Sequence, residues 1–176
     1  GSYLVKAAIG EVVDNETLGG ATTHCEISGV TDNKYDSDQD CLDAIRKIFS
    51  TLGENPKAGF DRIEAKEPGI SGEKLLEVFP TDRVKPYDML EVIKGLVDGG
   101  EIDEYKKDYG KTIICATARI DGWVVGIIAN QRKIVKTAKG EMQMGGVIYS
   151  DSADKAARFI MNCNQRKIPL VFLQDV

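Results

Sequence analysis

The residues best suited to chemistry are two adjacent glycines, Gly145 and Gly146, with Val147 directly after them. Glycine lets the backbone approach a ligand closely, and consecutive N–H groups in front of a helix can bind an oxyanion or a carbonyl oxygen. Glycine pairs also close many ordinary loops. The residues alone therefore leave two interpretations open, a backbone binding site and a loop without function.

Four basic residues lie shortly before the glycine pair, in a chain that is otherwise acidic. Guanidinium and ammonium groups bind phosphate through charge-assisted hydrogen bonds, so this segment can hold a phosphate-bearing ligand such as coenzyme A. A loop whose charges are simply solvated is the alternative interpretation. The residues concerned are Arg132, Lys133, Lys136 and Lys139.

The chain offers little for metal binding or nucleophilic catalysis. Its one histidine, His24, excludes a multi-histidine metal site, and Cys25 is its neighbour in sequence rather than a partner opposed in space. The four cysteines form no CxxC pair, so we predict reduced thiols and neither a zinc site nor a disulfide framework. The acidic run from Asp32 to Asp43 lacks the glycine and glutamate of an EF-hand loop, which indicates a solvated helix entrance.

The composition limits the partners. Acidic residues outnumber basic ones, 28 to 23, and the formal net charge is −5, so nucleic acid is not the expected partner. The apolar runs are only strand-length, so no membrane span is expected, and no signal peptide is visible. These features predict a cytoplasmic protein, or a mitochondrial-matrix protein in a eukaryote.

The elements that must position these residues fall into two parts with a connector between them. A helix is predicted over about residues 38–52, with carboxylates at its start and Gly53 at its end. Residues 54–85 contain three prolines and three glycines, which predicts a connector without regular structure. Its apolar residues between Leu75 and Phe79 are expected to pack against a neighbour.

From residue 86 the pattern becomes regular and predicts an α/β fold, with a ββα unit that leads into another strand. We expect a helix capped by Asp88 and a short charged helix over residues 101–110. A hairpin should follow, with Trp123 in the core and a type I′ turn at Asp121-Gly122.

The last part of the chain is predicted to run from loop to helix to strand. A polar excursion over residues 131–146 comes first, then a helix over 150–167, and finally the strand in KIPLVFLQDV. The helix is expected to turn one face toward the core, formed by Ala153, Ala156, Ala157, Ile160 and Cys163.

Three stretches resemble the carboxyltransferase (beta) subunits of biotin-dependent acyl-CoA carboxylases, in the order that the family has them. They are LVKAAIGEVVDNETLGGATTHCEISGVTD, YDMLEVIKGLVDGGEIDEYKKDYGKTIICATARIDGWVVGIIAN and GGVIYSDSADKAARFIMNCNQRKIPLVFLQDV. The resemblance covers nearly the whole chain apart from the connector and residues 131–144. The stretches IPLVFLQD and HCEISGVTD resemble the methylcrotonyl-CoA type slightly more than the propionyl-CoA type.

The resemblance implies a crotonase-like α/β fold with two related domains. On it, residues 1–53 are the C-terminal part of the N-terminal carboxyltransferase domain, residues 54–85 are the connector, and residues 86–176 begin the C-terminal domain. The chain is then expected to be a central fragment that spans parts of both domains.

The activity implied by the resemblance is transfer of a carboxyl group from carboxybiotin to an acyl-CoA through an enolate. The implied cofactor is biotin carried on a partner, and the implied substrate is a coenzyme A thioester. The implied partners are a biotin carboxylase or biotin carrier subunit and further copies of the carboxyltransferase subunit, and no metal is implied.

In the family, two glycine-rich loops supply the main oxyanion amides, and neither has a counterpart in this sequence. We therefore expect the isolated chain to be inactive. The resemblance leaves Gly145, Gly146 and Val147 as a candidate oxyanion or biotin contact.

Two other functions remain open. A related biotin-dependent acyl-CoA decarboxylase subunit, of the glutaconyl-CoA type, runs the same half-reaction in reverse. A non-catalytic interaction module is the third interpretation, since an unpaired sheet edge promotes association.

Overall fold

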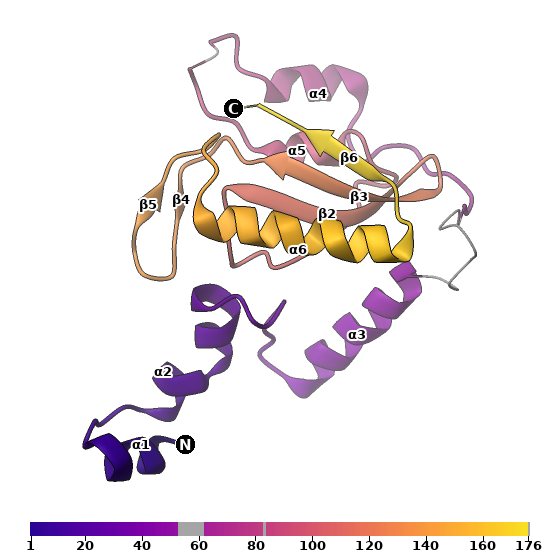
Figure 1. Cartoon of the computed structure of the whole chain (residues 1–176). Helices are drawn as coiled ribbons and strands as arrows, with labels where there is room; N and C mark the ends of the chain where they lie inside the picture. The colour runs from indigo at the N-terminus through magenta and orange to yellow at the C-terminus, as the bar shows by residue number, and fades with distance from the viewer. Residues whose placement is uncertain (53–61, 83, 176) are drawn as a thin grey trace.

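The computed structural model describes residues 1–52, 62–82 and 84–175. Figure 1 shows a sheet with helices on both faces and an N-terminal segment that extends away from it. The predicted helix end at Gly53 and the first part of the connector lie outside the described residues. Along the chain the elements are α1 (Ser2–Ile9), α2 (Asn15–Gly19), η1 (Thr23–Ile27), α3 (Asp38–Leu52), α4 (Gly72–Val78), α5 (Met89–Lys94), β1 (Ile102–Glu104), β2 (Ile113–Ile120), β3 (Trp123–Asn130), β4 (Val135–Lys136), β5 (Met142–Gln143), α6 (Ser150–Arg166) and β6 (Leu170–Leu173).

The main sheet has the strand order β1-β2-β3-β6. β2 and β3 form the predicted hairpin, and Asp121 and Gly122 at its turn have φ angles of 51° and 78°. Both angles are positive, as a type I′ turn requires. β6 runs parallel to β3, so the carboxyl ends of these two strands lie at the same edge of the sheet. The hairpin, its turn and the final strand are confirmed.

Two apolar clusters hold helices against the two faces of the sheet. α5 packs on one face, and the buried residues there include Met89, Val92, Ile93, Ile114, Val125 and Ile127. α6 packs on the other face, and the buried residues there are Ile113, Cys115, Ile128, Phe159 and Cys163. Since β3 is covered on both faces, every residue of the strand after Trp123 is buried.

α6 buries the predicted face only in part: Cys163 is buried and Ala156 and Ile160 pack against the same cluster, as predicted. Ala153 and Ala157 are exposed, and the buried residues are Ser152, Lys155, Phe159 and Cys163. Alanine gains little free energy from burial, so the large Phe159 side chain decides the rotation of the helix. That rotation buries Lys155, whose ammonium lies 3.9 Å from the Glu104 carboxylate. Burial lowers the pKa of Lys155 and raises the pKa of Glu104.

Residues 101–110 form a strand and turns, so the predicted charged helix is wrong. β1 pairs with β2 through Ile102 opposite Ala118 and Glu104 opposite Ala116. Pairing with a strand that is already fixed outweighs the helix preference of charged residues.

The environment of Trp123 and the structure of the connector also differ from expectation. Trp123 is 38% exposed, because it lies at the turn end of the hairpin, where the Arg62 guanidinium lies 5.5 Å from its ring. The connector contains a regular helix, α4, which begins after a Ser71 cap. As expected for part of the connector, Leu75 and Val78 pack against the α5 cluster.

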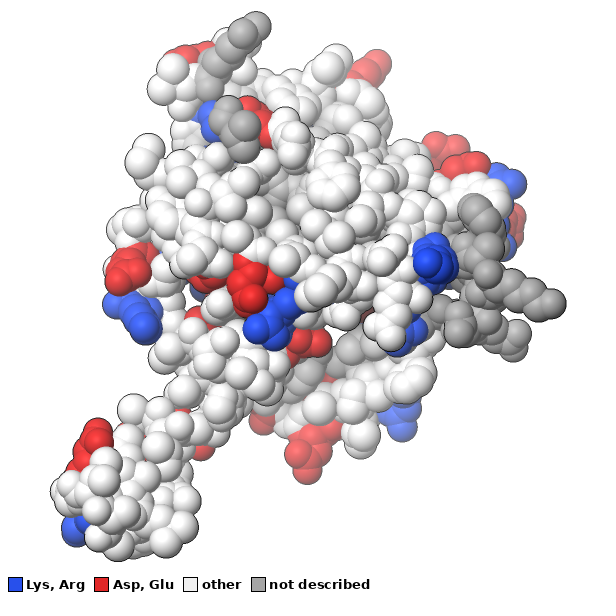
Figure 2. All heavy atoms as spheres, in the orientation of Figure 1, with Lys and Arg blue, Asp and Glu red and all other residues white. Residues whose placement is uncertain are grey.

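The charges on the surface are mixed in sign. On the face that Figure 2 shows, acidic and basic side chains lie close to one another. An example from α6 is the pair Arg158–Asp154, with the Arg158 Nε 3.0 Å from a carboxylate oxygen. Within the part of the chain that the structure describes, no helix combines the length and the apolar character needed to cross a membrane.

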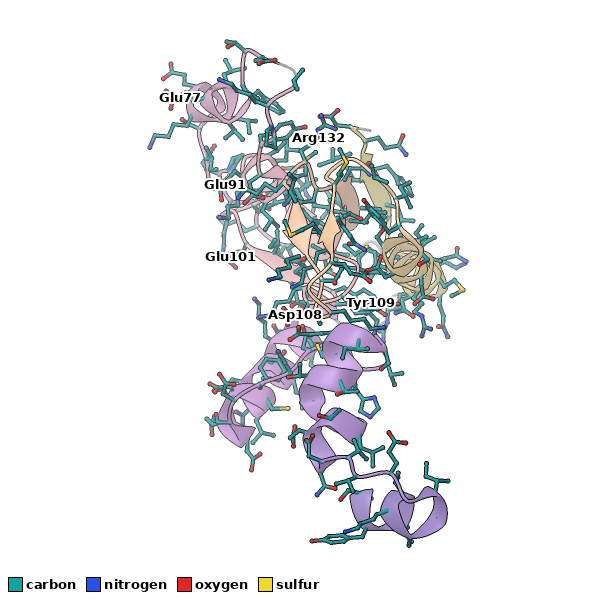
Figure 3. The ribbon with its side chains drawn as sticks, turned by 90° about the vertical axis from the view of Figure 1, so that its left-hand side faces the viewer. Glu77, Glu91, Glu101, Asp108, Tyr109 and Arg132 are labelled. Carbon is teal, nitrogen blue, oxygen red and sulfur yellow. The ribbon has the colours of Figure 1, made fainter. Side chains whose placement is uncertain are left out.

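A buried lysine fastens the N-terminal segment to the sheet. Lys106 is 1% exposed, and its ammonium donates to the carbonyls of Gly29 at 2.6 Å and Thr31 at 3.2 Å. It also pairs with the Asp32 carboxylate at 2.7 Å. Gly29 has a φ of +64°, and a Cβ there would lie 2.8 Å from the Tyr109 ring, so only glycine allows this approach. Figure 3 shows Tyr109 at the end of the sheet that the N-terminal segment approaches.

We expect Lys106→Met to loosen the N-terminal segment. Without the ammonium, two carbonyls and a carboxylate lose a charged partner, and the free energy of unfolding should fall by about 2 kcal/mol. Urea unfolding measures this loss, and limited proteolysis of the segment before α3 locates it. Lys107→Met changes the exposed neighbour and is the matched control. Equal unfolding midpoints for the two variants would contradict the anchoring role of Lys106.

Candidate functional site

Polar residues from three elements meet at the carboxyl ends of β3 and β6. Gln131 follows β3, Asp175 lies beyond the end of β6, and Asp88 caps α5. Figure 3 shows Arg132 at this end of the sheet, away from Tyr109. In α/β folds, ligands bind beyond the carboxyl ends of strands. We call this candidate site the strand-end cluster, which consists of Tyr87, Asp88, Gln131, Arg132, Lys133, Asp175 and the loop from Gly145 to Val147.

Gln131 is the buried centre of the strand-end cluster, with 6% of its surface exposed. Its side-chain oxygen accepts the backbone N–H groups of Met89, Arg132 and Lys133 at 3.2, 2.8 and 3.2 Å. Its side-chain amide nitrogen donates to an Asp88 oxygen at 2.8 Å. The side chain therefore ties the start of α5 to the base of the β4–β5 hairpin.

Asp88 caps α5 and holds a lysine. One carboxylate oxygen accepts the Leu90 N–H at 3.1 Å, and the other accepts the Lys133 ammonium at 2.6 Å. Burial by itself would raise the pKa of Asp88, but the hydrogen bonds from Lys133 and Gln131 outweigh burial and the pKa is lowered. The carboxylate form of Asp88 is thus favoured, and it keeps the Lys133 ammonium beside the strand ends.

Asp175 makes a second polar contact at the same edge. Its carboxylate accepts the Tyr87 hydroxyl at 2.7 Å and lies 3.3 Å from the Arg132 Nε. Burial and the neighbouring carboxylate raise the pKa of Tyr87 to about 12, so the phenol stays protonated at neutral pH. The chain beyond β6 is therefore joined to both the α5 entrance and the hairpin base.

The glycine loop lies directly against the hairpin base. A Cβ at Gly145 would lie 2.2 Å from the Arg132 carbonyl oxygen, and Gly146 has a φ of +79°. The Gly146 N–H donates to the Gln131 carbonyl at 2.8 Å, and the Met144 N–H donates to the Tyr149 hydroxyl at 3.0 Å. Since the Gly146 amide is engaged within the chain, the candidate ligand donors of the predicted trio are the amides of Gly145 and Val147.

The four predicted basic residues divide into two pairs. Arg132 and Lys133 belong to the strand-end cluster and form ion pairs with Asp175 and Asp88. Lys136 and Lys139 are exposed on the β4–β5 hairpin. Lys139 also lines a cavity of about 440 Å³ between this hairpin, the start of α6 and η1.

The sequence analysis missed three members of the strand-end cluster. Gln131, Tyr87 and Asp175 were not singled out, and Asp88 was recognised only as a helix cap. A usable signal was present for two of them, because Gln131 and Asp175 are polar residues one and two positions after apolar strands.

The histidine and its neighbouring cysteine lie in the N-terminal segment, apart from this cluster. The His24 ring lies 3.4 Å from the Ser28 hydroxyl, and the buried Cys25 thiol faces the Asp32 carbonyl at 3.8 Å. Burial raises the pKa of the Cys25 thiol, which favours the packing interpretation over a catalytic one. Among the described residues, no group of three or more His, Cys, Asp or Glu side chains could hold a metal ion.

Comparison with known proteins decides the family. The sequence matches the Carboxyl transferase domain over residues 1–176. The chain belongs to the carboxyl transferase domain family. It is 44% identical over 176 residues to the biotin-dependent 3-methylcrotonyl-coenzyme A carboxylase beta1 subunit of Mycobacterium tuberculosis, covering all of this chain and 31% of that protein. It is 43% identical to the mitochondrial methylcrotonoyl-CoA carboxylase beta chain of Dictyostelium discoideum, covering all of this chain and 28% of that protein.

A decarboxylase subunit is also among the relatives. The alpha subunit of methylmalonyl-CoA decarboxylase from Propionigenium modestum is 36% identical over 177 residues, covering all of this chain and 32% of that protein. The chain therefore spans about a third of the length of each of these three relatives.

A solved relative confirms the fold. The crystal structure of transcarboxylase 12S, with hydrolysed methylmalonyl-coenzyme A bound, matches with a TM-score of 0.84 and 32% identity over all of this chain and 32% of that one. The predicted crotonase-like α/β fold of the carboxyl transferase domain family is thereby confirmed.

We expect Gly145→Ala to displace the glycine loop from the hairpin base. The added methyl group cannot fit 2.2 Å from the Arg132 carbonyl oxygen, and forced overpacking of this kind costs about 1–3 kcal/mol. Thermal unfolding measures the cost. Gly72→Ala, at the start of α4 where a Cβ has nothing within 4 Å, is the matched control. A Gly145→Ala protein as stable as this control would show that the close approach is not required.

Asp88 should give part of the fold's stability a pH dependence. The folded-state pKa of Asp88 lies below the ordinary value of 3.8, so its carboxylate stabilises the fold above that value. This stabilisation is lost as the pH falls through the folded pKa. We therefore expect the stability difference between wild type and Asp88→Asn to be largest near neutral pH and to shrink below about pH 4.

Urea unfolding across this pH range measures the difference. Asp36→Asn, at an exposed position, controls for the change in net charge. A difference between wild type and Asp88→Asn that is constant with pH would contradict the assigned role of the carboxylate.

Proposed function

We propose that this chain is part of the carboxyltransferase (beta) subunit of a biotin-dependent acyl-CoA carboxylase, which moves a carboxyl group from carboxybiotin to an acyl-CoA through an enolate. The family match over residues 1–176 carries this proposal. The identity to two methylcrotonyl-type carboxylase subunits, at 43–44%, favours a methylcrotonyl-type acyl-CoA as the substrate. The activity is proposed for the whole subunit, and we expect the 176-residue chain to be inactive by itself.

Carboxyl transfer through an enolate requires hydrogen-bond donors from the protein and does not require a protein nucleophile. Carboxybiotin would supply the carboxyl group and, after cleavage of its N–C bond, a basic ureido nitrogen to take a proton from the carbon that is to be carboxylated, which in a methylcrotonyl thioester is the γ-carbon. The enolate carbon then bonds to the carboxyl carbon. Preorganised N–H groups stabilise the oxyanion that forms in such a step. The strand-end cluster fits this need, because the amides of Gly145 and Val147 belong to a loop fixed against the hairpin base.

The basic residues are proposed to bind the phosphate groups of coenzyme A. Lys136 and Lys139 are exposed and can reach a ligand without breaking an internal ion pair that the structure describes. Arg132 and Lys133 would add charge at the hairpin base. Ammonium and guanidinium groups bind phosphate strongly through charge-assisted hydrogen bonds.

The proposed partners and domain boundaries follow from the family. We infer that a biotin carboxylase or biotin carrier subunit presents the biotin and that the subunit forms a homo-oligomer, in the cytoplasm or the mitochondrial matrix. Residues 1–53 would complete one domain, 54–85 connect, and 86–176 begin the next. All four strands of the main sheet lie within 86–176, which supports the second boundary.

Decarboxylation of an acyl-CoA is the second candidate function. The identity of 36% to the alpha subunit of methylmalonyl-CoA decarboxylase supports it. The enolate and the oxyanion are the same in both directions, so the strand-end cluster fits the decarboxylase equally well.

The main test uses the whole subunit assembled with its biotin-carrying partner. We expect labelled carboxyl from bicarbonate to appear in the acyl-CoA product when ATP is present. A complex that only releases carbon dioxide from a carboxylated acyl-CoA would instead support the decarboxylase. A complex that does neither would overturn both functions.

Removal of the two exposed lysines should weaken substrate binding in the assembled enzyme. We expect the double change Lys136→Ala and Lys139→Ala to raise KM for the acyl-CoA about tenfold, the loss of one charge-assisted contact. The same change should leave KM for the acyl-pantetheine analogue unaltered, because that analogue lacks the nucleotide phosphates. Lys107→Ala, at an exposed site on another loop, is the control. Equal effects on both substrates would argue against phosphate binding by these lysines.

A further inference from the structure

We propose that Gln131 is a positioning residue for carboxyl transfer: it holds the Gly145–Val147 loop and the Lys133 ammonium in a fixed relation to each other. The inference rests on the proposed function of the subunit. The side-chain amide orders the backbone of Arg132 and Lys133, against which the glycine loop lies, and the Gln131 carbonyl accepts the Gly146 N–H.

Every polar atom of Gln131 makes a hydrogen bond inside the protein. A buried amide that lacks partners costs free energy, and this residue is 6% exposed. Its side chain makes the four hydrogen bonds described above, to Met89, Arg132, Lys133 and Asp88. Its backbone N–H donates to the Thr112 carbonyl at 3.0 Å, and its carbonyl accepts from Gly146 at 2.8 Å.

These hydrogen bonds permit only one orientation of the Gln131 side-chain amide. An ionised Asp88 oxygen accepts hydrogen bonds but cannot donate them, so it must face the NH2 group of Gln131. The three backbone N–H groups are donors, so they must face the side-chain oxygen. Glutamine is the residue of this length that offers a double donor on one side and an acceptor on the other.

The hydrogen bonds of Gln131 connect the two parts of the strand-end cluster that the proposed reaction uses, the glycine loop and Lys133. The carbonyl of Gln131 fixes the amide of Gly146 between the two candidate donors, Gly145 and Val147. The side chain fixes Asp88, which in turn holds the Lys133 ammonium at 2.6 Å. Because the Gln131 side chain is buried and its oxygen already accepts three N–H groups, it acts through these neighbours rather than by touching a ligand.

Gln131→Glu tests this role with almost no change of shape. The variant keeps the accepting oxygen but places a second oxygen 2.8 Å from the Asp88 carboxylate, and two such carboxylates must share a proton. The other charged or titratable groups recorded around this pair are Lys133, Arg132, Asp175, Tyr87 and Glu104, which interacts electrostatically with Asp88. Adding Asp88→Asn removes the clash, because the asparagine NH2 can donate to the new glutamate, but that NH2 no longer accepts the Leu90 N–H as the Asp88 oxygen does.

The experiment measures kcat and KM in the assembled holoenzyme with its biotin-carrying partner. For Gln131→Glu we expect kcat at neutral pH to fall about tenfold or more, as misplaced donors do, with KM for the acyl-CoA within about twofold of wild type. Lowering the pH toward about 5 should recover part of the lost kcat relative to wild type, because the carboxylate pair takes up a proton. The double variant Gln131→Glu with Asp88→Asn should recover the kcat at neutral pH only to the level of Asp88→Asn alone, because the clash is gone but the Asp88 carboxylate is lost. Gln165→Glu, at an exposed position on α6, is the matched control.

The outcomes separate the inference from the proposed function. A wild-type holoenzyme that transfers no carboxyl group would overturn the proposed function. An active wild type with Gln131→Glu indistinguishable from Gln165→Glu would overturn the positioning role alone. If Gln131→Glu does not fold, the folded double variant is compared with Asp88→Asn alone: an equal kcat supports the role, and a kcat tenfold lower overturns it.

Discussion

Strand β3 is hydrogen-bonded along both edges and covered by helices on both faces. The positions of the other strands and of the two covering helices are set by their contacts with it. β2 pairs with it as an antiparallel hairpin partner, and β6 pairs with it in parallel. α5 and α6 cover its two faces. A strand buried in this way cannot shift its register without exposing apolar side chains or breaking ladder bonds, so the residue that follows it is fixed in space. That residue is Gln131.

The strand-end cluster follows from where the chain leaves β3. The side-chain amide of Gln131 has four partners, which lie in two segments, the start of α5 and the two residues that directly follow Gln131. The glycine loop approaches the same backbone so closely that a side chain at Gly145 has no space. Backbone amides, rather than side-chain nucleophiles, are thus what this edge of the sheet can offer to a substrate. Such donors suit a reaction through an enolate, whose difficulty lies in the charge on oxygen.

The candidate site could be predicted only in part, and the reason is physical. Glycine pairs and basic runs are visible in a sequence because each consists of neighbours, so Gly145, Gly146 and the four basic residues were found. Asp88, Gln131 and Asp175 lie at separations of 43 and 44 residues along the chain and meet only through strand pairing. Sequence reasoning therefore named the loop and missed the residues that hold it.

The sequence by itself determined the β2–β3 hairpin, its Asp-Gly turn, the helix and strand that end the chain, and membership in the family. These depend on local chemistry, such as the positive φ of Asp121 and Gly122, or on residue patterns preserved over long stretches. Only the tertiary structure decided that residues 101–110 supply a strand and that α6 turns Lys155 inward. Both outcomes depend on partners distant in sequence: β2 offers a free edge to β1, and the packing of Phe159 on the sheet sets the face that α6 buries.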